Sequence, residues 1–107
     1  MGDSLKALED QYMLLTQQLS MILAACKTQT QRDAVMTQYV TSRRNYWNSI
    51  NKIFHDDDPK IAALVRQMSN VQTQIKDCTN HLDKIAQVID DITDAVTVGT
   101  QLAGLAG

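Results

Sequence analysis

One stretch, residues 59–98, limits the possible folds more than any other part of the chain. Its apolar residues recur in a three-four alternation: Ile61, Leu64, Met68, Val71, Ile75, Cys78, Leu82, Ile85, Ile89, Ile92 and Val96. A repeat averaging about 3.5 residues is typical of a helix that packs along one narrow apolar stripe against partner helices. The rest of the chain is therefore expected to supply those partners.

Residues 3–55 carry a compatible pattern. After Asp3 or Ser4 as N-cap, the stripe is Leu5, Leu8, Tyr12, Leu15, Leu19, Ile22 and Cys26, and counting on in sevens gives Met36, Val40, Arg43, Trp47, Ile50 and Phe54. Because the heptad phase continues, the pattern favours one helix over 3–55. Residues 27–33 contain no large apolar side chain, and Thr30 with Asp33 imitates a capping box, so a break near 28–30 is the alternative.

The clearest turn signal in the chain is the sequence His-Asp-Asp-Asp-Pro at residues 55–59. Asp58 as N-cap with Pro59 at the first helical position is a helix start signal, so a tight turn is expected at 55–58. The last residues, 99–107, are small, uncharged and interrupted by glycine, which predicts an apolar tail after helix 59–98.

These patterns predict one all-α domain over residues 1–107. With 44% hydrophobic and only 5% aromatic residues, its core is built from aliphatic side chains. The favoured architecture is a long antiparallel helical hairpin of coiled-coil type, with helix 3–55 folded back on helix 59–98 and completed by oligomerisation. The alternative is a three-helix bundle with a break near 28–30, in which the last helix overhangs the other two.

The far end of this hairpin is the predicted self-association surface. Residues 19–26 are apolar on nearly every side of the expected helix, and such a helix normally packs against neighbours on more than one side. The residues assigned to self-association or partner binding are Leu15, Leu19, Ile22, Leu23, Ile89, Ile92, Val96 and Leu102.

A basic-aromatic cluster is formed by Arg43, Arg44, Trp47 and Lys52. It is a candidate patch for phosphate, nucleic acid or an acidic partner. The favoured interpretation is structural, because Arg43 lies in the stripe one turn before Trp47 and a polar residue there can fix helix register. Gln29 and Asp33 occupy the same phase and are candidates for the same role.

No catalytic, cofactor or metal site is predicted. His55 and the three aspartates after it are consecutive and cannot easily converge on one ion, so capping of the turn explains them better. Cys78 and His81 have a spacing that zinc sites use, but no second ligand pair accompanies them. The sequence shows no Gly-rich phosphate loop or nucleophile elbow, so a non-enzyme is predicted.

Charge and composition limit which partners and which cellular compartment are expected. A net charge of −2 gives no field that attracts a polyanion, so nucleic acid is disfavoured. The first residues lack the pattern of a secretory signal peptide, and the uncharged segment 11–26 is shorter than a spanning helix requires. Two cysteines are too few for a disulfide scaffold. We expect a cytoplasmic protein, or one exported by a route without an N-terminal signal peptide.

The predicted function is that of a self-associating dimer or tetramer, acting as a structural, adaptor or chaperone-like component of a protein assembly. Its partner, besides a second copy, would be another helical protein bound by helix-in-groove contact. The alternative is a signal-less secreted or membrane-active helical protein that uses its apolar end, and a membrane is the less favoured partner. A nucleic-acid-linked regulator using Arg43, Arg44 and Lys52 is the weakest interpretation.

Overall fold

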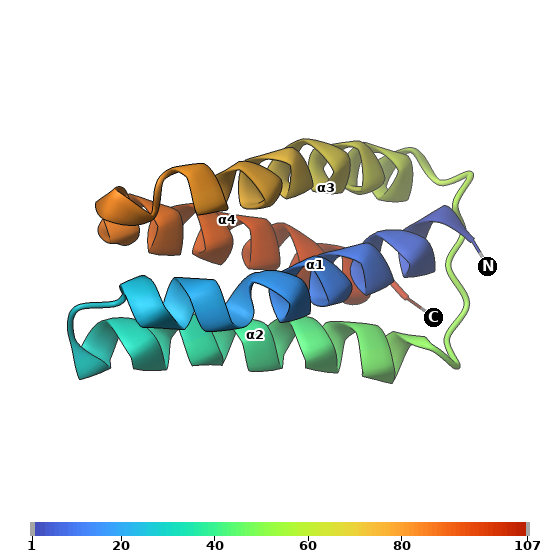
Figure 1. The fold of residues 1–107 in the computed structure, drawn as a ribbon. Helices are drawn as coiled ribbons and strands as arrows, with labels where there is room; N and C mark the ends of the chain where they lie inside the picture. The colour runs from blue at the N-terminus through green and yellow to red at the C-terminus, as the bar shows by residue number, and fades with distance from the viewer. Residues whose placement is uncertain (1, 107) are drawn as a thin grey trace.

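Four α-helices make up most of the residues that the structure, a computed structural model, describes, namely 2–106 (Figure 1). They are α1 (Asp3–Ala25), α2 (Gln29–Ser49), α3 (Pro59–Asp77) and α4 (Ile85–Ala103), with the short 3₁₀ turns η1 (Cys78–Asn80) and η2 (Leu82–Lys84) between α3 and α4. No strand occurs among residues 2–106. The all-α prediction is confirmed.

The single helix expected over residues 3–55 is divided into α1 and α2. The backbone leaves the helical conformation at Cys26, and Thr28 caps α2 by accepting a hydrogen bond from the Gln31 amide at 3.1 Å. The Gln31 side chain reaches back and accepts from the Lys27 amide at 2.7 Å. This reciprocal arrangement is close to a capping box and explains why the chain turns at 26–28, two residues before the predicted break at 28–30.

The single helix expected over 59–98 is also divided. Helix α3 begins at Pro59 with Asp58 as its cap, as the start signal indicates, but the chain reverses at 78–84. The Asp77 carboxylate accepts a hydrogen bond from Asn80 and contacts His81, each at 2.9 Å. These contacts lower the pKa of Asp77, the Asn80 bond contributing most, and fasten the reversal.

The four helices pack as two antiparallel pairs, α1 with α2 and α3 with α4 (Figure 1). Helix α1 also packs on α3, and α4 packs on α2, so α2 and α3 lie across a diagonal of the bundle. The connection 50–58 spans that diagonal at the end of the molecule where α1 begins and α4 ends (Figure 1). Each of the two expected long helices is broken once. The chain therefore forms a four-helix bundle of 42 × 22 × 18 Å, which is shorter than the expected two-helix hairpin.

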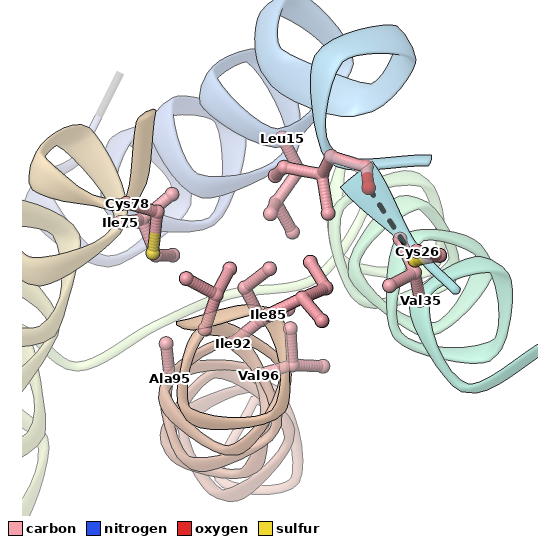
Figure 2. Close-up of a cluster of buried hydrophobic side chains, with 11 residues drawn as sticks. Leu15, Cys26, Val35, Ile75, Cys78, Ile85, Ile92, Ala95 and Val96 are labelled. Atoms are coloured by element: carbon pink, nitrogen blue, oxygen red, sulfur yellow. Dashed lines mark hydrogen bonds between the residues drawn. The ribbon is translucent and has the colours of Figure 1, made fainter. Parts of the chain in front are cut away.

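The core has two neighbouring parts. The larger lies toward the 26–28 and 78–84 turns, and most of its side chains are labelled in Figure 2. They come from all four helices and from the two turns: Leu15, Ile22, Cys26, Val35, Ile75, Cys78, Ile85, Val88, Ile92, Ala95 and Val96. The smaller lies toward the termini and consists of Ala7, Leu8, Ile61, Met68 and Leu102. The fully buried Gln11 joins them, because its Nε2 donates to the Ala95 carbonyl at 2.8 Å and contacts Met68 Sδ at 3.7 Å.

The connection 50–58 is fastened to the start of α1 by Asp56. Its carboxylate accepts hydrogen bonds from the Asp3 amide at 3.1 Å, from the Ser4 amide at 3.3 Å and from the buried Ser4 hydroxyl. Helix α1 has no cap from its own preceding residue, so a carboxylate from a distant loop satisfies its first amides.

Replacing Asp56 by alanine should lower the free energy of unfolding by about 1–2 kcal/mol, because the first amides of α1 and the Ser4 hydroxyl lose their partner. Urea unfolding followed by circular dichroism measures the change. The adjacent Asp57, whose side chain makes no hydrogen bond among residues 2–106, is the matched control, and Asp57→Ala should change stability by less than about 0.5 kcal/mol. Equal losses in both variants would show that Asp56 does not cap α1.

Candidate interaction surface

Helix α2 exposes several large apolar side chains and buries several polar ones, and among its large apolar residues Val35 is buried in the core. Met36, Val40, Trp47 and Ile50 are 37, 43, 56 and 37% exposed, respectively. On the side of the same helix that faces the bundle, Ser42, Asn45 and Ser49 are buried together with Val35. A surface helix in a monomer normally has the reverse arrangement, so the outer face of α2 is a candidate interaction surface.

The inner face of α2 is held by hydrogen bonds and tyrosine contacts. Asn45 Nδ2 donates to Thr100 Oγ1 of α4 at 3.0 Å, and the Tyr46 hydroxyl donates to Glu9 Oε2 of α1 at 2.8 Å. The ring of Tyr12 lies 6.1 Å from that of Tyr46, within the range for aromatic pairs. These partners, with the buried Val35, hold this side of α2 against the bundle and leave Met36, Val40 and Trp47 outside.

The outer face is hollowed into a shallow groove of about 510 Å³. Its lining combines apolar, hydroxyl and charged side chains: Asp33, Met36, Thr37, Val40, Thr41 and Arg44. All of these side chains belong to α2, so the hollow lies on the outer surface of this one helix and offers apolar and charged groups together to a partner.

The charges on this face have few partners within the chain. Asp33 accepts a hydrogen bond from Gln29 Nε2 at 2.7 Å but forms no ion pair, and Arg43 and Arg44 enter no ion pair among residues 2–106. All four residues of the predicted basic-aromatic cluster are exposed. Arg43, Arg44 and Trp47 lie on α2, and Lys52 lies in the connection that follows it. The Trp47 ring lies 6.0 Å from that of Tyr46.

The residues assigned to self-association lie elsewhere. Leu15, Ile22, Ile92, Val96 and Leu102 are buried, and Leu19, Leu23 and Ile89 are half-buried against the larger part of the core. Their apolar surface is covered by other helices of the same chain, because the two breaks fold α1 and α4 into one bundle. They expose little surface to a second molecule in this arrangement, so the candidate surface moves to α2.

The sequence contained the signal for this outer face. Met36, Val40, Arg43, Trp47 and Ile50 were found by the heptad count and expected to face a helix of the same chain. A second stripe with equal spacing precedes it by one residue, at Val35, Tyr39, Ser42, Tyr46 and Ser49, and this is the stripe that faces the bundle.

The thiol and imidazole at Cys78 and His81 do not form a ligand pair. Cys78 is buried in the core, whereas His81 is exposed and its Nε2 lies 2.9 Å from Asp77 Oδ2. Within residues 2–106 no group of three or more His, Cys, Asp or Glu side chains is placed to hold a metal ion. Burial raises the pKa of Cys78 to about 11, with smaller contributions from the negative charges of Asp91 and Asp77.

Both thiols should be unreactive in the folded protein. Cys26 and Cys78 are free and buried, and burial raises the pKa of each. Because the thiolate is the reactive form, a disulfide reagent at pH 8 should label neither residue in native protein and both in denaturant. Rapid labelling of one thiol in native protein would show that its helix end opens easily.

No helix of the described residues is both long enough and apolar enough to cross a membrane. Comparison of the chain with protein-family models, with curated proteins and with solved structures finds no match.

Proposed function

We propose that this protein is a non-catalytic helical interaction module that self-associates through the outer face of α2, as a structural or adaptor component of a protein assembly. One observation carries the proposal: α2 buries Ser42, Asn45 and Ser49 while it exposes Met36, Val40 and Trp47. That distribution is expected of a helix with one partner on each side.

The physical reason for association is the removal of this apolar face from water. Burial of apolar surface contributes about 25 cal/mol per Å², so covering side chains of this size on two molecules supports a stable contact. The tryptophan and arginine on the face belong to the residue types that contribute most at protein interfaces. An added helix along the groove would bury them together.

A second candidate function is binding to a lipid surface. The apolar end expected to contact membranes is mostly buried, so a lipid-binding face would also be the outer face of α2 with the connection after it. Trp47 and Ile53, 56 and 67% exposed, lie near Arg43, Arg44 and Lys52 in sequence, and aromatic, aliphatic and basic residues together favour an anionic interface.

Two measurements on one preparation separate these functions. Light scattering should give a mass that rises from the 12.0 kDa of a single chain to about twice that value as the concentration increases. Flotation with phosphatidylcholine vesicles, and with vesicles that also contain phosphatidylserine, should leave the protein unbound. A mass that stays at one chain contradicts self-association, and flotation of that monomer with anionic vesicles favours the lipid function.

A further inference from the structure

The outer stripe of α2 is complementary to itself when a second α2 runs in the opposite direction. Asp33, Met36, Val40, Arg43 and Trp47 follow one another at intervals of three and four residues, which is the spacing of a helix–helix contact. We propose that a second copy of this chain docks antiparallel on α2 with Asp33 of each copy opposite Arg43 of the other. The inference rests on the proposed self-association and specifies its partner and its register.

The register follows from pairing the stripe with itself. In an antiparallel pair with its two-fold axis beside residue 38, Met36 faces Val40 of the other copy, and Asp33 faces Arg43. Gln29 then faces Trp47 of the other copy, so the indole lies over the amide side chain at each end. Each contact occurs twice, as a two-fold axis requires.

Charge excludes the parallel arrangement. A parallel pair in register sets each stripe residue against its own copy, so Asp33 would face Asp33 and Arg43 would face Arg43. Like charges at facing positions oppose association, whereas the antiparallel pair turns the same four charges into two attractive contacts. The charges of the stripe therefore favour an antiparallel pair of helices over a parallel one.

Charge also selects among antiparallel registers. If the axis moves toward Ile50, to lie between residues 41 and 42, Arg43 faces Val40 and Asp33 faces Ile50. Each charged group then lies against an apolar side chain and has no oppositely charged partner. The free energy lost by removing it from water is not compensated. The axis beside residue 38 pairs Asp33 with Arg43 and leaves Arg44, which lines the same groove, beside that contact.

The second copy also explains why these charges are unpaired within the chain. Arg43 and Arg44 are exposed without an ion-pair partner among residues 2–106, and Asp33 is exposed less than three turns away on the same helix. One face therefore offers both the acid and the base of an intermolecular pair. Helix α2 is about 30 Å long, and a single helix pair of this size gives a reversible dimer rather than a permanent one.

Charge reversal on either side tests the register. Asp33→Arg makes the stripe wholly basic, and the combined Arg43→Asp and Arg44→Asp variant makes it wholly acidic. Each variant alone should self-associate at least about tenfold more weakly than the wild-type chain, because two attractive contacts become repulsive. An equimolar mixture of the two variants should regain the wild-type affinity, since every facing pair is again of opposite sign.

Sedimentation equilibrium on each protein and on the mixture gives the dissociation constants, and circular dichroism confirms the helix content. The control is Asp90→Arg, a charge reversal on an exposed part of α4, which should leave self-association unchanged. Wild-type affinity in both α2 variants, or a mixture that associates no better than its components, overturns the register while self-association stands. A wild-type chain that stays monomeric refutes the proposed function itself.

Discussion

Replacing Ile92 by alanine should lower the free energy of unfolding by about 2–5 kcal/mol, the largest effect expected of any single change considered for this chain. Ile92 is 1% exposed and lies where α4 meets the side chains of α1 and α3 (Figure 2). Truncating it leaves a cavity that a packed bundle fills only in part. Urea unfolding monitored by circular dichroism measures the loss.

The same variant separates a core residue from an interface residue. If Ile92 packs within its own chain, the loss of stability should not depend on protein concentration, and the mass in solution should match that of the wild-type chain. Asp94→Ala, an exposed position on the same helix, is the control and should change stability by less than about 0.5 kcal/mol. A small loss of stability that depends on protein concentration would instead indicate that Ile92 lies in the interface predicted from the sequence.

Replacing Gly99 by alanine should destabilise the protein by about 1–3 kcal/mol, although alanine is the better helix former. A Cβ atom at this position would lie 2.5 Å from Gln11 Oε1 and 3.6 Å from Met68 Cε. The Gln11 side chain is buried and its Nε2 is held by the hydrogen bond to Ala95, so moving its Oε1 away from the new methyl group weakens or breaks that bond. The loss of a buried hydrogen bond outweighs the gain in helix propensity.

A double-mutant cycle isolates this contact. In a Gln11→Ala background the obstructing oxygen is absent, so Gly99→Ala should become neutral or stabilising by up to about 1 kcal/mol. Thermal unfolding of the four proteins gives the coupling energy. Equal effects of Gly99→Ala in both backgrounds would mean that Gln11 does not obstruct position 99.

The sequence predicted the all-α class and the ends of several helices because those features are local. Asp58 and Pro59 start α3 through contacts with their nearest neighbours, and the apolar stripes of α1, α3 and α4 face the core. The break at 26–28 also had a local signal, Thr28 followed by Gln31, beside the weaker pair Thr30 and Asp33.

The reversal at 78–84 had only a weak local signal, an asparagine at 80 placed to bond Asp77. It contains no glycine or proline, and the heptad spacing runs through it from Ile75 to Ile89 without a change of phase. Cys78 and Ile85 are buried on either side of the turn, so both satisfy the stripe although they belong to different helices. A regular repeat cannot distinguish a continuous helix from two helices whose stripes meet by coincidence of phase.

The orientation of α2 was unpredictable for a different reason. Two stripes of equal spacing lie one residue apart on this helix, and apolar character alone favours the one with Met36, Val40 and Ile50. The other stripe faces the bundle, where Val35 lies in the core, Tyr46 bonds to Glu9 and the adjacent Asn45 bonds to Thr100, both partners being distant in the sequence. Contacts of this kind cannot be derived from local spacing.

The most direct test of the proposed interaction surface compares the solution masses of three chains at matched concentrations. Val40→Lys places a charge at the centre of the outer face of α2, and Met13→Lys, a residue 47% exposed on α1, is the matched control. At concentrations where the wild-type chain is dimeric, we expect Met13→Lys to be dimeric and Val40→Lys to be monomeric with unchanged helix content. A wild-type chain that is monomeric throughout, or a Val40→Lys variant as dimeric as the wild type, would contradict self-association through the outer face of α2.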